Sequence, residues 1–288
     1  MNVYKIITGK IIEKLKDGVV PWKKPWCGDN PQNFVTKHQY RGVNALLTGL
    51  TSYTSPYWIT FNQARSLDIH INKGEKATMI VYFNLSHTTP KNNNLEKCEN
   101  LPEIKKNKQS LPMILKCYYI FNLEQTDYIR NDIEFSYVPQ KDSCENIVDN
   151  WKNKPQVLFG GNRAYYSLSQ DTIHMPIIHT FDSTEEYYST LFHEAIHSTA
   201  HPHRLNRKEI TAYSGRATKE YGVEELIAEI GSSFLCNKAG ISNAVFDNQA
   251  SYINHWLTSL QNDKTLLIKA ANKAQKAVDY ILNEVNDE

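Results

Sequence analysis

The segment His193-Glu194-Ala195-Ile196-His197 constrains the fold of this 288-residue chain more than any other feature. Two histidines four positions apart lie on one face of an α-helix, where both imidazoles can reach a single metal ion. The glutamate beside the first histidine can then take a proton from a metal-bound water. The pattern predicts a metal-dependent hydrolase of the zincin kind, with His193 and His197 as ligands and Glu194 as the catalytic base.

The residues around this motif predict the helix that it requires. Ser183 is a candidate N-cap with Glu186 three residues later, and apolar residues such as Leu191 and Ile196 recur through residues 183–200. A buried metal helix needs such an apolar side. The alternative interpretation is an ordinary helix with two surface histidines. Further helices are expected over residues 220–239 and 249–283.

Two residues compete for the position of third ligand. His203 follows His197 by six residues, as in the metzincin pattern, but Ala200 replaces the glycine of that pattern and no methionine follows it. Glu229 lies on a later helical segment, four residues after Glu225, and acidic residues beside an apolar stripe need a partner when buried. We expect Glu229 to bind the metal and Glu225 to orient a ligand histidine. The alternative is that both glutamates are exposed. Zinc is the expected ion, with Mn²⁺ or Co²⁺ as alternatives.

Amide hydrolysis also needs a donor near the developing oxyanion. Four side chains near the motif are candidates for this role, and the sequence does not choose among them: Tyr213, Tyr221, His201 and His203. The strand-like segment 171–176 is a candidate sheet edge for an extended peptide substrate.

Charge is divided unevenly along the chain, whose net charge is only +1. Residues 1–80 hold 11 Lys+Arg and 5 Asp+Glu, whereas residues 146–288 hold 13 and 17. In the basic segment aromatic residues alternate with cations, as in single-strand binders, where cations follow phosphates and rings stack on bases. A core with tryptophans under a solvated lysine surface fits the same composition equally well. The candidate DNA-binding residues are Trp22, Lys23, Lys24, Trp26, Tyr40, Arg41, Asn44, Trp58, Lys73 and Lys76.

Length and pattern predict an α+β chain of two domains. Residues 1–140 are expected to form a small mixed α/β domain, with helices near residues 4–15, 42–50 and 61–67, strands at 78–83 and 117–121, and a polar insertion at 86–111. Residues 146–288 are expected to form a largely helical zincin-like domain. The five cysteines form no CxxC pair, and no apolar run resembles a signal peptide or a membrane span. We therefore expect a cytoplasmic protein with free thiols and no membrane partner.

Taken in order, the motifs resemble the ArdC-like antirestriction proteins of conjugative plasmids and related mobile elements. The matching segments are Gly18–Trp22, Tyr40–Asn44, Trp58–Ala64, Lys73–Lys76, Phe121–Thr126, Asn162–Tyr166, Asp171–Pro176, His193–His197, Arg204–Arg207 and Glu224–Gly231. The resemblance implies an N-terminal domain that binds single-stranded DNA and a C-terminal zincin metallopeptidase-like domain. It also implies that His193, His197 and Glu229 are the metal ligands and that Glu194 is the base.

The resulting expectation is a single-stranded-DNA-binding antirestriction protein that protects incoming mobile-element DNA and whose zinc metallopeptidase domain cleaves an unidentified protein. One alternative is a non-catalytic DNA-masking protein with a structural or vestigial zinc site. Another is a peptidase without any DNA role.

Overall fold

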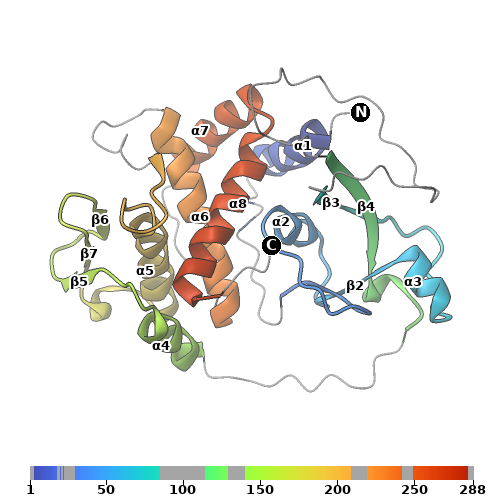
Figure 1. The fold of residues 1–288 in the computed structure, drawn as a ribbon, viewed down its shortest axis with the longest axis horizontal. Coiled ribbons are helices and arrows are strands. Elements are labelled where there is room, and N and C mark those ends of the chain that lie inside the picture. Colours follow the sequence, from blue (N-terminus) through green and yellow to red (C-terminus); the bar gives the residue numbers. More distant parts are fainter. Residues whose placement is uncertain are drawn as a thin grey trace.

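The computed structural model describes residues 3–17, 20, 22, 30–84, 114–128, 140–208, 219–241 and 249–284. Two β-sheets and a group of long helices confirm the α+β class (Figure 1). The insertion expected at 86–111 lies outside the described residues. None of the described helices is long and apolar enough to cross a membrane.

The N-terminal part contains a four-stranded sheet and three helices. They are α1 (Val3–Lys16), β1 (Gln32–Asn33), α2 (Val43–Gly49), β2 (Tyr57–Thr60), α3 (Phe61–Ser66), β3 (Thr78–Asn84) and β4 (Ile114–Asn122), followed by the 3₁₀ turn η1 (Leu123–Gln125). The strand order is β1-β2-β4-β3, and only the β1–β2 pair is parallel. The three helices and the two long strands expected from sequence are confirmed.

Helix α2 packs on one face of this sheet. Asn44 fixes the contact, because its Nδ2 donates to the carbonyl of Val81 at 2.7 Å and its Oδ1 accepts from the amide of Val81 at 2.9 Å. The opposite face is aromatic and apolar, with a buried cluster of Tyr40, Trp58, Ile80 and Ile120.

The C-terminal part combines a small sheet with five helices. They are α4 (Gln140–Asn150), β5 (Gln156–Phe159), β6 (Tyr165–Ser167), β7 (Thr172–Met175), the 3₁₀ turn η2 (Ile178–Thr180), α5 (Thr184–Ser198), α6 (Lys219–Ala239), α7 (Gln249–Asn262) and α8 (Leu266–Leu282). The strand order is β5-β7-β6. The expectation that segment 171–176 forms a sheet edge is therefore wrong, since β7 is the central strand and its backbone groups pair on both sides.

The prediction of a helix over 249–283 is also wrong in one respect, because the structure has two helices in this range, α7 and α8. The break lies at Asp263, whose Oδ1 accepts from the amide of Thr265 at 2.8 Å and from its hydroxyl at 2.6 Å. Such local side-chain bonds compete with helical hydrogen bonds, so they end one helix and start another.

One hydrophobic core spans both parts of the chain. Ile7 and Ile11 of α1 are fully buried in the same cluster as residues of α5, α6, α7 and α8. The Trp22 ring meets the Trp256 ring edge to face, with centroids 5.3 Å apart. The Thr8 hydroxyl donates to the carbonyl of Lys264 at 2.7 Å. The two predicted domains thus share an apolar interior.

Candidate metal centre

Helix α5 presents the two histidines of the motif to helix α6. The Ser183 hydroxyl accepts from the amide of Glu186 at 3.1 Å and caps α5, as the sequence predicts. In a capping box, the Glu186 side chain would accept from the amide of the N-cap residue Ser183. Here its carboxylate instead accepts from the amide of Asp182, one residue before the N-cap, at 2.9 Å. The capped helix places His193 and His197 one turn apart on the side that faces α6.

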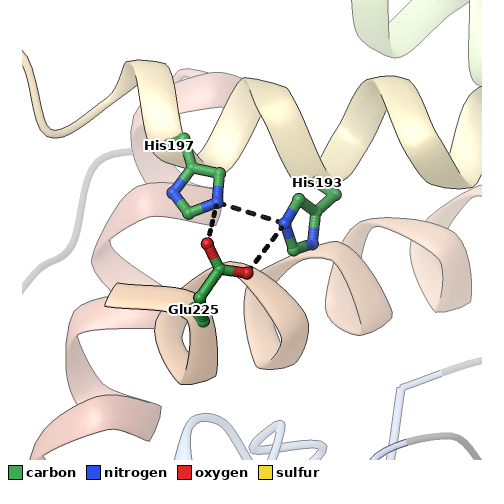
Figure 2. Close-up of side chains that lie close together, drawn as sticks. All are labelled: His193, His197 and Glu225. Carbon is green, nitrogen blue, oxygen red and sulfur yellow. Dashed lines mark hydrogen bonds and ion pairs between the residues drawn. The ribbon is translucent and has the colours of Figure 1, made fainter. Parts of the chain in front are cut away.

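Three side chains converge between the two helices (Figure 2). The Nε2 atoms of His193 and His197 lie 3.1 Å apart. Glu225 of α6 turns one carboxylate oxygen toward each of them, Oε2 at 3.6 Å from His193 and Oε1 at 3.4 Å from His197. Among the described residues, this is the single group of three such side chains close enough to share an ion.

Each histidine has a second carboxylate behind its ring. Glu229 Oε1 lies 3.5 Å from Nδ1 of His193, and Glu224 Oε1 lies 3.4 Å from Nδ1 of His197. A metal-binding histidine commonly uses its other ring nitrogen in this way, which fixes its tautomer and orientation. Glu225 is thus the carboxylate that faces both Nε2 atoms, and Glu229 lies behind the ring of His193. Which of the two glutamates binds the metal stays a prediction.

Sequence reasoning gave no role to Glu224, which is fully buried. Arg207 holds it in place, with Nη2 at 2.5 Å and Nε at 3.1 Å from its two oxygens. The same guanidinium donates to the hydroxyl of Thr199 and to the carbonyl of Ile196, so it ties the end of α5 to α6. No local pattern signals this role, because Arg207 follows α5 in a loop and Glu224 lies 17 residues later.

The carboxylates give the site a strongly negative field. Burial alone would lower the pKa of His197, but the nearby carboxylates of Glu225, Glu224 and Glu194 raise it to about 10. The pKa of His193 is also raised against the effect of burial, through Glu225 and Glu229. Burial would raise the pKa of Glu225, but the two histidines hold it well below its usual range. The site therefore attracts a positive charge.

Glu194, the residue that follows His193, is buried. It is 7% exposed, and its Oε2 atom has no hydrogen-bond partner among the described residues. A buried carboxylate oxygen without a donor is costly, so the site is complete only when a water or another donor is present.

The donor set fits a divalent ion of zinc size. Nitrogen and oxygen ligands at 2.0–2.1 Å in a tetrahedral arrangement lie about 3.3 Å apart. The separations observed here are 3.1 Å between the two nitrogens and 3.4 and 3.6 Å from nitrogen to oxygen. The two oxygens of Glu225 each face one histidine, so the carboxylate as a whole spans the two nitrogens.

The other candidates for this site lie elsewhere or outside the described residues. His203 is exposed and does not belong to the cluster, and its amide donates to Nδ1 of His201 at 3.3 Å. Tyr213 is not among the described residues. Tyr221 lies on α6, but its side chain is not described. The role of oxyanion donor thus stays a prediction.

The structure also shows where the candidate DNA-binding residues lie. Lys23, Lys24 and Trp26 are outside the described residues. Trp22, Tyr40 and Trp58 are only 2%, 7% and 2% exposed, so their rings are core residues in this conformation and are not open to a base. This corrects the stacking role expected for those three rings.

The polar DNA-binding candidates divide into two residues with structural contacts and two that are exposed. Arg41 forms ion pairs with Asp279 and Glu284, and the Asn44 amide is engaged by Val81, so both have structural contacts. Lys73 and Lys76 are exposed.

An exposed aromatic strip, which the sequence did not single out, lies on the sheet face opposite α2. Tyr82 is 57% exposed and stands opposite Lys116 in the β3–β4 pairing. Tyr118 of β4 contacts it edge to face, with ring centroids 6.4 Å apart. Tyr119, also 57% exposed, points to the other face. The strand register would have been needed to find this strip.

Comparison with known proteins follows the same division of the chain. Residues 1–121 match the N-terminal domain of anti-restriction factor ArdC, and residues 142–273 match the zincin-like metallopeptidase family. The metal-free crystal structure of the antirestriction protein ArdC from plasmid R388 is 34% identical, with a TM-score of 0.75 over 98% of this chain and 97% of that chain. The Mn(II)-bound structure of the same protein has equal identity and TM-score and covers 100% of both chains.

A longer relative is the DNA primase TraC of Escherichia coli. It is 30% identical over 293 residues, which are 96% of this chain and 26% of the primase. The chain therefore spans about a quarter of the length of that relative.

Proposed function

The chain belongs to the family of ArdC antirestriction proteins, and we propose that it protects incoming mobile-element DNA by combining two activities. Its N-terminal part binds single-stranded DNA, and its zincin-like part hydrolyses peptide bonds of an as yet unidentified protein in the cytoplasm. Zinc is the proposed ion. The observation that carries the peptidase proposal is the convergence of His193, His197 and Glu225 beside the buried carboxylate of Glu194.

We propose Glu225 as the third ligand and Glu229 as the residue that orients His193. Glu225 and Glu229 lie on the same face of α6. They differ in the imidazole nitrogen that each one faces. Glu225 faces the Nε2 atoms, which also face each other, whereas Glu229 faces an Nδ1 atom on the far side of the ring. Ligand and orienting carboxylate then occupy successive turns of α6.

A bound divalent ion supplies a Lewis acid and lowers the pKa of its water to about 7. Glu194 accepts the proton of that water at Oε2, which has no competing donor among the described residues. The same oxygen can return the proton to the leaving amine, because one carboxylate serves as base and then as acid. His193 and His197 are held in position by Glu229 and Glu224.

Cleavage of casein or a peptide library by the zinc-loaded protein tests this activity. Glu194→Gln keeps the shape of the side chain but removes the base, so activity should fall about 10²–10⁴-fold while metal content stays the same. Glu185→Gln, an identical change in the first turn of the same helix, is the matched control and should retain activity. Equal activity of wild type and Glu194→Gln contradicts the proposal.

We propose that the strip of Tyr82, Lys116 and Tyr118, together with Lys73 and Lys76, forms the single-strand-binding surface. Exposed rings beside cations match the chemistry of stacking on bases and pairing with phosphates. Tyr82→Ala should weaken oligonucleotide binding about 5- to 150-fold, since one stack contributes about 1–3 kcal/mol. Tyr119→Ala is the control, because that ring is equally exposed on the opposite face.

Salt dependence gives an independent check on this surface. Contact with Z phosphates of a single strand predicts a slope of about −0.7Z in log affinity against log salt concentration, and losing Lys73 or Lys76 should reduce Z by about one. Lack of binding to any oligonucleotide at low salt would exclude the DNA role.

Protection of a conjugating plasmid in cells distinguishes the two activities. A peptidase mechanism requires that Glu194→Gln loses protection. The alternative, a DNA-masking protein with a structural metal site, requires that Glu194→Gln keeps protection and Tyr82→Ala loses it.

A further inference from the structure

The small sheet β5-β7-β6 has a buried inner face and an exposed outer face. The inner face packs on α5, and its side chains include Ile173 and Tyr166, both buried in the main core. Side chains alternate along a strand, so the next residue on each strand faces outward. The strand register sets three of these side by side across the outer face: Leu158, His174 and Tyr165.

Two of these side chains form a stack of parallel rings. The Tyr165 and His174 rings are stacked, with centroids 4.4 Å apart and planes 10° apart. His174 is held in this orientation by Thr172, whose hydroxyl oxygen lies 3.1 Å from Nε2. Leu158 of β5 stands opposite His174 and bounds the stack on that side. Tyr165 lies on β6, the last strand of the sheet, and is 44% exposed, so the stack ends in an accessible ring.

This sheet is locally basic, although the C-terminal part of the chain is acidic. Between positions 151 and 180 the cations are Lys152, Lys154 and Arg163, and all three are exposed. The acidic residue in this range is Asp171, which accepts from Nη1 and Nη2 of Arg204 at 2.7 and 2.8 Å. The three cations are therefore not balanced by an acidic residue in their own segment, and the sheet favours an anionic partner.

Arg163 lies on the same side of the sheet as the stacked rings. Ala164 and Tyr166 both contact the main core, so Tyr165 between them points outward. By the same alternation Arg163, two residues before Tyr165 and exposed, comes to the outer face. An accessible ring thus has a cation beside it.

We propose that the outer face of β5-β7-β6 is a second surface for single-stranded DNA, where a base stacks on Tyr165 and Arg163 meets a phosphate. Sheets that present aromatic rings beside cations bind single strands in this way. An extended peptide would instead pair with the backbone of an edge strand, and it needs neither a flat ring nor a cation. The inference rests on the proposed DNA-binding function and extends it to the zincin-like part.

The second surface is separate from the aromatic strip of β3 and β4. Helices α5, α6 and α8 lie between the two sheets (Figure 1). A short strand on one sheet therefore leaves the other sheet accessible, and the two surfaces can be counted.

Native mass spectrometry with oligothymidylate of about six nucleotides, a length within the range of one single-strand site, makes this count at low salt. Wild type should bind two strands per protein. Tyr165→Leu, which keeps an apolar side chain but removes the ring, should weaken the second binding step about 5- to 150-fold. Tyr165→Phe should bind like wild type, because it keeps the ring. Tyr119→Leu, the same change at an exposed ring of the other sheet, is the matched control and should also bind like wild type.

Crosslinking locates the strand directly. A short oligonucleotide that contains 5-bromodeoxyuridine should, after irradiation, become attached to the peptide that holds Tyr165, and it should still do so in Tyr82→Ala. Arg163→Gln should reduce the slope of log affinity against log salt concentration for the second step by about 0.7.

The outcomes separate this inference from the proposed function. If wild type binds no oligonucleotide at low salt, the DNA-binding function fails and the second surface fails with it. If wild type binds one strand, and Tyr165→Leu binds it equally without a crosslink to this sheet, only the inference is overturned. If Tyr165→Leu instead raises the KM for casein and leaves DNA binding unchanged, the face binds peptide, and the inference is again overturned.

Discussion

Gly231→Ala should separate the two helices that build the metal centre. Gly231 lies on α6 where it crosses α5, and it faces Ile196, which sits between the two histidines in sequence. A Cβ atom added at Gly231 would lie 2.7 Å from Cδ1, 2.9 Å from Cγ1 and 3.1 Å from Cγ2 of Ile196. Carbon atoms pack best at about 3.5–4.0 Å, so the helices are about 0.8 Å too close for alanine.

Ile196 cannot turn aside to relieve this clash. It is fully buried, and a β-branched residue in a helix has one strongly preferred side-chain rotamer. Overpacking of this kind costs about 1–3 kcal/mol. Alanine recovers up to about 1 kcal/mol of helix propensity over glycine. The free energy of unfolding should thus fall by about 0–3 kcal/mol.

Metal affinity should respond to Gly231→Ala more clearly than the free energy of unfolding does. A shift of about 0.8 Å between α5 and α6 exceeds the tolerance of about 0.5 Å within which a site keeps its geometry. The position of Glu225 relative to the histidines would change by that amount. We expect zinc affinity, measured by competition with a chelator, to fall about 10- to 100-fold, as it does when a supporting contact of a metal site is lost.

Gly9→Ala is the matched control for this change. Gly9 lies inside α1, and an added Cβ atom would meet nothing within 4 Å. It should stabilise the protein by up to about 1 kcal/mol and leave zinc affinity unchanged. Adding Ile196→Ala to Gly231→Ala should restore zinc affinity, because it removes all three clashing atoms. The reasoning is refuted if Gly231→Ala behaves like Gly9→Ala in both measurements.

Three other perturbations address the ligand roles and the ion pairs that support the site. Glu225→Ala should remove measurable zinc binding, whereas Glu229→Gln should weaken it about 10- to 100-fold; the reverse order would exchange their roles. Arg207→Leu leaves a buried carboxylate unpaired and should cost about 3–5 kcal/mol in urea unfolding, and a cost below about 1 kcal/mol would contradict the buried ion pair. Burial opposes the shift, but Arg204 holds the pKa of Asp171 below its usual range. The stabilisation is present above the unfolded pKa of about 3.9 and is lost as pH falls through the lower folded value. Arg204→Gln should therefore make the free energy of unfolding fall less steeply with decreasing pH below the unfolded pKa.

The parts of the site that sequence predicts are those fixed by a single helix. The spacing of His193 and His197 determines their common face wherever that helix packs, and the N-cap at Ser183 is a local feature too. For this reason the helix and its two histidines could be placed from the sequence alone.

The choice between Glu225 and Glu229 needs a tertiary contact. Both lie on one face of α6, one turn apart, so periodicity treats them alike. Which one meets the Nε2 atoms depends on how far α6 is displaced along α5. That displacement is set by Gly231 against Ile196 and by the Ser232 hydroxyl, which donates to the carbonyl of Ser189 at 3.1 Å.

The aromatic residues were also hard to interpret, because their exposure depends on tertiary contacts. Trp22 and Trp58 lie in a basic segment, but a ring stacks on a base only if the fold leaves it exposed. Tyr82 and Lys116 are 34 residues apart in sequence, and only the antiparallel register of β3 with β4 brings them to one face. Composition describes which rings are present, and packing decides which are available.

The charge balance of the metal centre explains why an ion belongs there. The described centre contains four carboxylates, those of Glu194, Glu224, Glu225 and Glu229, and all four residues are buried. Arg207 compensates one of them. Such an excess of buried negative charge is costly unless cations join it. Protons on the histidines provide part of the compensation, which is why the pKa of His197 rises to about 10, and a divalent ion provides more while displacing those protons. A metal ion and protons therefore compete for the negative charge of these carboxylates, three of which lie on α6 and one, Glu194, on α5 beside the histidines.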